Sequence, residues 1–164
     1  MNDKVNSLKP ASQRVEAAAH ALGLNVTIQT MSQSTRTAEE AAAACGCTVA
    51  QIVKSLVFRG KESGRPYLLL VSGANRVNEK AVAGILGEAL ARPDAQYVRD
   101  ITGYAIGGIP PVGHASPIAT YIDQDLLKFD VVWAAAGTPE SVFSVIPAEL
   151  RDKAGAMVIS VSGA

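Results

Sequence analysis

Apolar positions recur along this chain with two periods, and the changes of period divide it into short elements. Spacing of three or four residues predicts helices over residues 12–22, 38–45, 79–86 and 147–153. Ser12, Thr37 and Asn78 can each cap one of these helices, because a side-chain oxygen there can accept a hydrogen bond from a backbone N–H group. Thr37 also begins a capping-box pattern, and Thr48 begins another, so a short extra turn is expected before residue 52.

Alternating or continuous apolar runs predict the strands between these helices. The runs cover residues 25–31, 52–58, 67–71, 95–98, 118–122, 131–136, 141–146 and 157–161. Turns are expected at residues 60–65 and 137–140, and Asp123 is expected to cap one helical turn. Strands that follow one another in runs of two or three do not give the regular alternation of a doubly wound sheet. The expected fold class is therefore mixed α+β, with short helices flanking a curved β-sheet.

Composition narrows the class of protein without identifying it. The 164 residues fit one domain over 1–164, with 48% hydrophobic and 18% charged residues. No apolar run reaches the roughly 18 residues that a membrane span needs, and the N-terminus lacks the layout of a signal peptide, so a cytoplasmic location is the default expectation. The formal net charge is zero, so any contact with nucleic acid should be local and should rest on a few cations such as Lys54, Arg76 and Arg36. An aromatic content of 5% argues against a broad stacking platform but allows one nucleotide end to be bound.

The sequence predicts neither a metal site nor a cofactor. Cys45 and Cys47 are only two residues apart, which is not the spacing of a common zinc site, and only two histidines could complete one. There is no Walker loop and no dinucleotide-binding fingerprint.

A loop rich in glycine and proline over residues 105–114 separates two stretches of ordinary core pattern. Glycine allows a positive φ and a close approach of the backbone to a ligand, whereas proline fixes φ and removes its own N–H donor. The combination is typical of a stiff loop that exposes its remaining N–H groups to a small polar ligand. A tight connection that merely needs these residues for its turns is an equal alternative.

Lys54 lies within the apolar run over residues 52–58, where alternation places it on the face of Ile52, Leu56 and Phe58. An ammonium group is rarely buried without a partner, so Lys54 either reaches solvent or lines a cleft that binds an anion such as a phosphate or carboxylate. The alternative is an edge-strand lysine that prevents aggregation.

Polar side chains follow the next strand, where Ser72, Asn75 and Arg76 form a turn at the strand end. Arg76 is a candidate ligand contact or a solvated surface charge. His114 ends the glycine and proline loop and is a candidate acid, base or ligand contact, although an inert histidine is an equal alternative. Ser72, His114 and Asp123 could nominally form a catalytic triad, but Ser72 lacks the Gly-x-Ser-x-Gly elbow.

Five segments, taken in order, resemble the YbaK/prolyl-tRNA-synthetase-associated (ProX-type) editing family. The matching segments are residues 37–42, 51–58, 70–76, 103–114 and 132–139. The resemblance implies a partly barrel-like sheet and a free-standing deacylase that removes a wrong amino acid from a tRNA, typically alanine or cysteine from a tRNA for proline. It implies binding of the 3′ acceptor end of an aminoacyl-tRNA and a relationship with prolyl-tRNA synthetase.

The resemblance also implies roles for individual residues. The lysine of the family corresponds to Lys54, and the Gly-x-x-x-Pro loop corresponds to residues 107–111. Gly137 and Thr138 correspond to a turn that shapes the amino-acid pocket. Some relatives carry a histidine in the strand that follows, where this chain reads Glu-Ser-Val-Phe-Ser over residues 140–144. The match to the family begins near Thr37 and includes no diagnostic residue before it.

The chemistry of an aminoacyl ester suits these residues. The ester is already reactive, so the enzyme needs to hold it, polarise its carbonyl and admit water or the neighbouring ribose hydroxyl. Backbone N–H groups of Gly107, Gly108 and Ile109 could polarise the carbonyl, while Pro110 and Pro111 stiffen the loop. A pocket that includes Ala135, Gly137 and the two prolines would select a small side chain.

Two alternatives from other classes stay open at the level of sequence. One is a non-catalytic module of the same fold that binds a tRNA end or regulates a synthetase. The other is a hydrolase of free esters, which would not need a phosphate contact at Lys54.

Overall fold

The computed structural model describes residues 8–163 and confirms the mixed α+β class, with one mixed sheet and five α-helices in that range. The helices are α1 (Pro10–Ala21), α2 (Ala38–Cys45), α3 (Glu79–Leu86), α4 (Ala95–Thr102) and α5 (Pro147–Ala154). The strands are β1 (Gln29–Thr30), β2 (Ile52–Gly60), β3 (Pro66–Ser72), β4 (Leu90–Ala91), β5 (Ala119–Asp123), β6 (Val132–Ala135), β7 (Ser141–Val145) and β8 (Met157–Ile159). Short 3-10 turns cover Val49–Gln51 and Gln124–Lys128.

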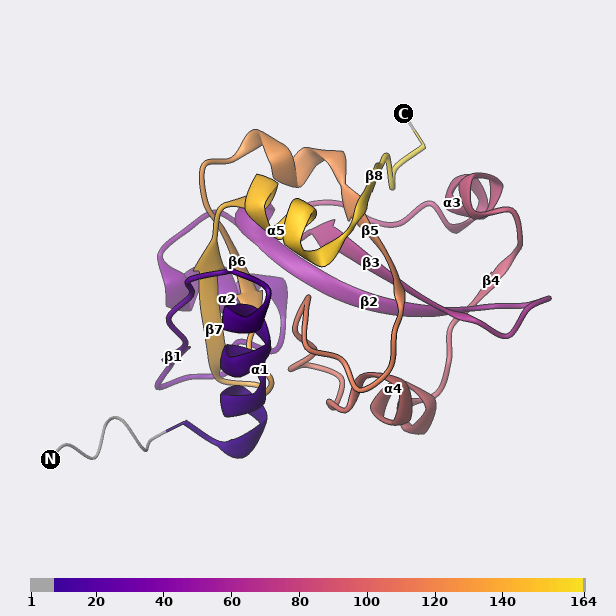
Figure 1. Ribbon diagram of the computed structural model, residues 1–164. Helices are drawn as coiled ribbons and strands as arrows, with labels where there is room; N and C mark the ends of the chain where they lie inside the picture. Colours follow the sequence, from indigo (N-terminus) through magenta and orange to yellow (C-terminus); the bar gives the residue numbers. More distant parts are fainter. Residues whose placement is uncertain (1–7, 164) are drawn as a thin grey trace, which may run out of the picture.

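The strands form a sheet in the order β1-β7-β6-β2-β3-β5-β8, and β4 pairs separately with β2. The central pair is the antiparallel β2–β3 hairpin, and β2 pairs in parallel with β6 while β3 pairs in parallel with β5. Figure 1 shows β2 as the long strand that crosses the molecule from α2 to the hairpin tip beyond β4. The two strand segments on either side of residues 60–65 therefore adjoin, as the sequence indicates.

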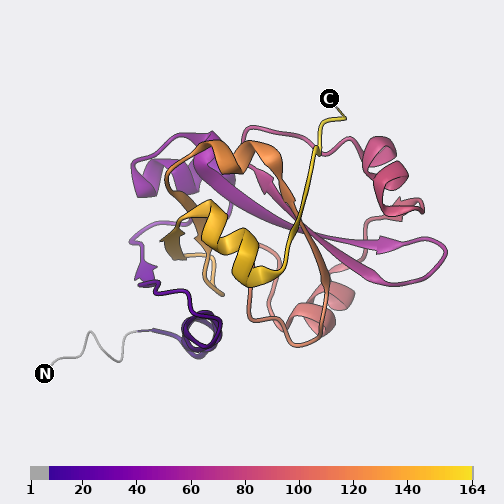
Figure 2. The same cartoon turned by 45° about the horizontal axis from the view of Figure 1, so that its top comes forward.

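Helices cover both faces of the sheet, which explains why β3 is apolar at nearly every position. Leu68 and Leu70 pack into one core with buried residues of α1, α4 and α5. Tyr67, Leu69 and Val71 pack into a second core with Val82 of α3, and α2 covers a smaller core around Ile52. In the rotated view of Figure 2, α3 and α4 lie on either side of the β2–β3 hairpin.

Pairing along β2 is interrupted in the middle of the sheet. On one side β2 pairs with β3 from Val53 to Arg59. On the other side it pairs with β6 only at residues 52–53 and with β4 only at residues 59–60. Within the described part of the chain, residues 54–58 therefore have no strand beside them on that side. This gap leaves an open strand edge next to the main core.

Several local expectations from the sequence are confirmed. Thr37 and Thr48 form capping boxes, Asn78 caps α3 through the N–H of Ala81, and Asp123 accepts a hydrogen bond from Asp125 in the turn that follows β5. The helix from Pro147 and the closing strand also form. Among residues 8–163, no helix combines the length and apolar character that a membrane crossing needs.

Other local expectations are wrong. Residues 95–98 form the start of α4 and not a strand, because the Asp94 side chain accepts a hydrogen bond from the N–H of Tyr97 and starts a helix. Ser12 does not cap α1, which already begins at Pro10, and its hydroxyl donates instead to the carbonyl of Ala136 at 2.7 Å. The strand expected over residues 25–31 forms only at Gln29–Thr30, as β1. The short strand β4 was not expected, because Leu90–Ala91 shows no clear apolar pattern.

Candidate active site

A cavity of about 250 Å³ lies at the open edge of β2. Its walls come from β2, β6, the start of α2 and the loop over residues 106–109, and they are mainly apolar. Lining residues are Ala38, Ala41, Ile52, Val53, Leu56, Ile106, Ile109, Trp133, Ala134, Ala135 and Val142, with Thr35, Arg36, Thr37, Lys54, Ser55 and Gly107 as the others. This cavity is called the inner cavity below.

A second cavity of about 560 Å³ adjoins the inner one further along β2 and is called the outer cavity. The two share five lining residues, which are Lys54, Ser55, Leu56, Ile106 and Ile109. Only the outer cavity reaches Arg76 and Arg92. The open edge of β2 therefore has the smaller, mainly apolar inner cavity at one end. The larger outer cavity, which contains arginines, lies at the other end.

Lys54 lies in the walls of both cavities and is half-buried. Its Nζ donates a hydrogen bond to the carbonyl oxygen of Asn75 at 2.6 Å. Burial lowers the pKa of Lys54 below its usual value, and nearby Arg76 lowers it further, while Glu39 and Asp123 act in the opposite direction. The ammonium has one protein partner and two donor positions left for a ligand.

The turn after β3 holds Lys54 in place through a buried carboxylate. Asp123, only 1% exposed, accepts hydrogen bonds from the N–H of Ser72 at 3.1 Å and from the side-chain amide of Asn75 at 2.8 Å. Ser72 donates its own hydroxyl to the carbonyl of Ala50 and lies outside both cavities. Asp123 thus fixes the turn that contains Ser72 and Asn75, and the carbonyl of Asn75 in turn holds the Lys54 ammonium.

The glycine and proline loop begins with a β-turn over residues 105–108. The N–H of Gly108 donates to the carbonyl of Ala105 at 3.1 Å, and Gly107 has φ +100°, a value that favours glycine at the third position of a type II turn. The backbone N–H groups of Gly107 and Ile109 have no hydrogen-bond partner within residues 8–163, and both residues line the inner cavity. Ile109 is 7% exposed, so an unpaired donor there is costly until a ligand accepts its hydrogen bond.

A second glycine turn packs against the back of this loop. The N–H of Gly137 donates to the carbonyl of Gly108 at 2.8 Å, and a Cβ on Gly108 would lie 2.9 Å from backbone atoms of Gly137 and Thr138. Gly137 in turn lies against the backbone of Ala11 in α1. The hydroxyl of Thr138 is 2.7 Å from that of Ser141. Gly137 and Thr138 line neither cavity, and they hold the loop on its side away from the cavities.

His114 also lies behind the loop and outside both cavities. Its Nε2–H donates to the carbonyl of Pro110 at 2.7 Å, and burial lowers its pKa, which favours the neutral ring. Pro110 and Pro111 are buried and line neither cavity. The structure thus brings together Lys54, Gly107 and Ile109 at the inner cavity, with Arg76 in the outer one.

Three lining residues had no clear signal in the sequence pattern, namely Ser55, Trp133 and Arg92. Trp133 and Ser55 occupy ordinary strand positions. Arg36, which also lines the inner cavity, comes from an irregular segment that becomes part of the site only when the chain is folded.

Nothing in the described residues forms a metal centre, because no group of three or more histidine, cysteine or acidic side chains between residues 8 and 163 could hold an ion. Burial raises the pKa of Cys45 to about 11, with a smaller contribution from Cys47. Both thiols are therefore poorly suited to act as thiolate ligands at neutral pH.

This chain belongs to the aminoacyl-tRNA editing domain family, whose pattern it matches over residues 32–153. It shares 46% sequence identity and a TM-score of 0.90 with the crystal structure of a candidate trans-editing enzyme for prolyl tRNA synthetase, covering 95% of this chain and 99% of the other. The fold and the family expected from the sequence are thereby confirmed.

Two sequence relatives show how the domain occurs elsewhere. An uncharacterised protein of Bacillus subtilis, YwhH, is 32% identical over 119 residues, which is 73% of this chain and 75% of YwhH. Proline--tRNA ligase of Limosilactobacillus fermentum is 34% identical over 94 residues, which is 55% of this chain but only 16% of the ligase. The chain therefore corresponds to a small part of the much longer synthetase.

Proposed function

We propose that the protein is a deacylase that hydrolyses the ester of a misacylated tRNA without being part of a synthetase. The observation that carries this proposal is the pair of unpaired N–H groups at Gly107 and Ile109, in the wall of a small cavity that also contains the Lys54 ammonium. Donors aimed at a carbonyl oxygen are the main requirement for cleaving an activated ester. Membership of the editing family supports the same reaction.

In the proposed reaction the ester carbonyl accepts hydrogen bonds from the N–H groups of Gly107 and Ile109. Gly108 is the weaker candidate donor, because its N–H already binds the carbonyl of Ala105. The oxygen of a water molecule forms the new bond to the carbonyl carbon. The bond from that carbon to the ribose oxygen breaks, and the attacking group's proton passes to the ribose oxygen. Attack by the neighbouring ribose hydroxyl would only move the acyl group to that oxygen, and water would still have to cleave the resulting ester.

The inner cavity suits an uncharged amino acid. Its wall of alanines, Ile52, Trp133 and Val142 is apolar, and its volume of about 250 Å³ is less than half the 560 Å³ of the outer cavity. The described residues place no carboxylate in this wall that could bind a cationic side chain. Alanine or cysteine esterified to a tRNA for proline is the substrate that the family resemblance suggests. A small cavity rejects larger amino acids more reliably than it separates two small ones.

The outer cavity is the proposed place for the 3′ end of the tRNA. Lys54 lies between the two cavities, and Arg76 lies next to it. The two cations can contact the phosphate backbone while the aminoacyl group enters the inner cavity. Prolyl-tRNA synthetase is a proposed partner because the domain recurs within that enzyme in relatives.

A panel of mischarged tRNAs tests the reaction, and loop variants test its mechanism. Gly107→Ala should reduce turnover by about 10²–10³-fold, because the Cβ disfavours the φ of +100° that sets the N–H direction. Gly84→Ala is the matched control, since a Cβ there would meet no atom within 4 Å. His114→Ala should cost less than Gly107→Ala, because His114 supports the loop through Pro110 and lies outside both cavities.

Other outcomes would favour other functions. If His114→Ala abolishes activity while the glycine variant remains active, a histidine mechanism replaces the backbone donors. Tight binding of a tRNA end without hydrolysis of any ester would indicate a non-catalytic module. Equal activity on free amino-acid esters and on charged tRNA would indicate a general esterase.

A further inference from the structure

Arg36 lies across the turn that carries the unpaired N–H of Gly107. A Cβ built on Gly107 would lie 3.0 Å from Cγ, 3.1 Å from Nε and 3.3 Å from Cδ of Arg36. The stem of the arginine therefore covers the glycine, and its head begins directly above the peptide. Arg36 is also in the wall of the inner cavity, yet the residue as a whole is exposed. It forms the rim of the cavity.

The backbone on both sides of Arg36 is firmly held. Thr35 is 6% exposed, and both its N–H and its hydroxyl donate to the carbonyl of Pro139, at 2.7 and 2.8 Å. On the other side Thr37 caps α2 through its capping box with Glu40. The N–H of Arg36 itself donates to the Ser34 hydroxyl at 3.2 Å. Such a fixed backbone limits the positions that the guanidinium can reach.

The guanidinium has no partner of its own in the described part of the protein. No ion pair or side-chain hydrogen bond of Arg36 occurs between residues 8 and 163. The nearby carboxylate of Glu40 accepts hydrogen bonds at Oε1 from the N–H of Thr37 and the hydroxyl of Ser34, and Arg36 helps to lower its pKa without forming an ion pair with it. An unpaired, fork-shaped cation at the rim of a binding cavity is suited to an incoming oxyanion.

We infer that Arg36 binds the phosphodiester that joins the terminal nucleoside of the substrate to the rest of the RNA, and so anchors the ester over Gly107. This inference rests on the proposed deacylase function. The oxyanion formed from the ester already has two backbone donors, at Gly107 and Ile109, whereas the exposed guanidinium lies at the rim of the inner cavity, where it can meet the RNA chain. A phosphodiester presents two oxygens that match the two parallel N–H bonds of the fork. The guanidinium therefore binds and orients the substrate, and the backbone donors act on the carbonyl.

The test compares two substrates that differ only in this phosphodiester. One is a mischarged tRNA, and the other is the same amino acid esterified to adenosine alone. Arg36→Gln should lower kcat/KM for the tRNA by about 10- to 100-fold, mainly through KM, and should change hydrolysis of the aminoacyl-adenosine less than about twofold. Arg36→Lys keeps the charge without the fork and should restore part of the loss. Arg59→Gln is the control, because Arg59 is also exposed but lines neither the inner nor the outer cavity.

Binding of non-hydrolysable amide analogues separates this inference from the proposed reaction. Wild-type protein should bind aminoacyl-cytidylyl-adenosine amide more tightly than aminoacyl-adenosine amide, and Arg36→Gln should remove that difference. If this holds while no ester is hydrolysed, the phosphate contact stands and the catalytic proposal is wrong. If Arg36→Gln weakens both analogues equally, or neither, the phosphate contact is wrong. If wild-type protein does not distinguish the analogues, the inference is also overturned.

Discussion

Lys54 keeps its charged group in a half-buried position, where burial lowers its pKa. The folded protein therefore favours the charged form of this lysine less than the unfolded chain does, even with the hydrogen bond to Asn75. Retaining a lysine here is understandable if the ammonium binds substrate. A residue of this kind trades stability for function.

We predict that Lys54→Met lowers deacylation by at least about 10²-fold without lowering the free energy of unfolding. Methionine fills a similar volume, and the loss of a disfavoured charge offsets the loss of one hydrogen bond. Turnover of mischarged tRNA and urea unfolding of the same preparation measure the two effects. Lys61→Met, at an exposed position in the hairpin turn, is the control. Normal turnover in folded Lys54→Met would exclude the assigned role.

Single residues of the site differ in how far the sequence could reveal them. Lys54 was visible as a charge within an apolar run, and the glycine loop was visible from its composition. Asp123 was predicted only as a cap and a nominal triad member, and Arg36 only as a local cation. Their contacts with Asn75 and with Gly107 depend on the approach of distant segments, which the sequence does not show. Gly137 and Thr138 were expected in the pocket wall but lie behind the loop, because alternation cannot show which turn packs in front of another.

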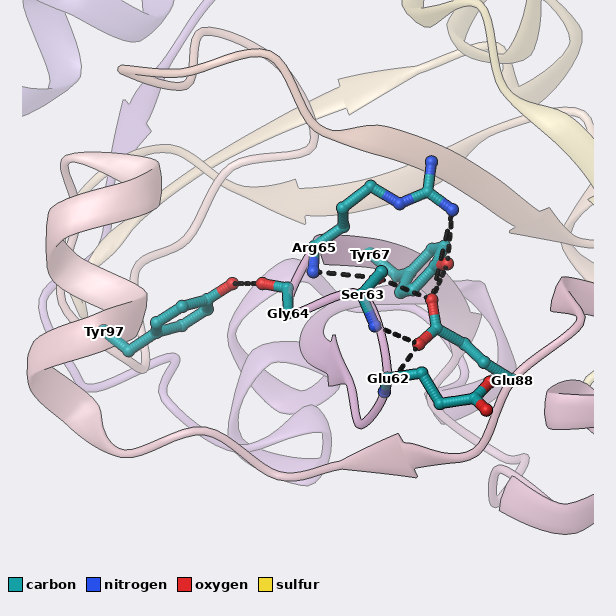
Figure 3. Close-up of polar contacts among 7 residues, drawn as sticks. All are labelled: Glu62, Ser63, Gly64, Arg65, Tyr67, Glu88 and Tyr97. Carbon is teal, nitrogen blue, oxygen red and sulfur yellow. Dashed lines mark hydrogen bonds and ion pairs between the residues drawn. The ribbon is translucent and has the colours of Figure 1, made fainter.

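Among the elements, the β2–β3 hairpin depends on a carboxylate from another part of the chain. Figure 3 shows Glu88, which follows α3, enclosed by the tip of the hairpin. Its Oε1 accepts hydrogen bonds from the backbone N–H groups of Glu62 and Ser63. Its Oε2 accepts hydrogen bonds from the hydroxyls of Ser63 and Tyr67, at 2.6 Å each. Tyr97 of α4 adds a hydrogen bond from its hydroxyl to the carbonyl of Gly64. Two elements therefore hold the far end of the strand whose middle lines both cavities.

Glu88 should make the stability of the hairpin depend on pH. Its side chain is 6% exposed, and the hydrogen bonds from Ser63 and Tyr67 lower its pKa from 4.5 to about 2. A carboxyl whose pKa is lower in the folded state stabilises the protein above the unfolded value. That stabilisation is lost as the pH falls from about 4.5 to about 2.

We predict that Glu88→Gln lowers the urea midpoint at pH 7. The variant should also lack the loss of stability that protonation of Glu88 causes between about pH 4.5 and 2. The amide would place N–H donors against groups that are themselves donors. Urea unfolding at several pH values measures the midpoint, and hydrogen exchange at Glu62 and Ser63 measures opening of the tip. Glu62→Gln removes a charge of the same sign nearby and should have a smaller effect. Equal effects of the two variants would show that Glu88 contributes only its charge.

Element type was easier to predict than element role. The helices with clear caps and the central strands follow from local patterns. Helix α4 was missed because Tyr97 and Val98 favour strands, whereas the Asp94 cap and burial of Val98 and Thr102 decide the outcome. The open edge of β2 could not be predicted, since it depends on where β6 and β4 stop pairing.

At the scale of the whole molecule, equal numbers of acidic and basic residues leave no overall field to attract RNA. On the proposed function, binding must then rely on cations in the walls of the two cavities. There are four, of which Arg92 is already paired with Glu79 at 2.8 Å, so Lys54, Arg36 and Arg76 are left for the RNA. On that proposal, the open edge of β2 determines where the substrate lies, and these local charges determine how strongly it is held.

We therefore predict a shallow dependence of RNA binding on salt. Three phosphate contacts to a single-stranded end should give a slope of about −2 for log K against log salt concentration. Raising salt from 50 to 200 mM should then weaken binding roughly 20-fold, far less than for proteins with many phosphate contacts. Fluorescence anisotropy with a labelled acceptor-end RNA measures the slope, and Arg36→Gln should reduce its magnitude by about 0.7. A slope several times steeper would reveal an extended basic surface, whereas an unchanged slope in the Arg36 variant would place the third phosphate contact elsewhere.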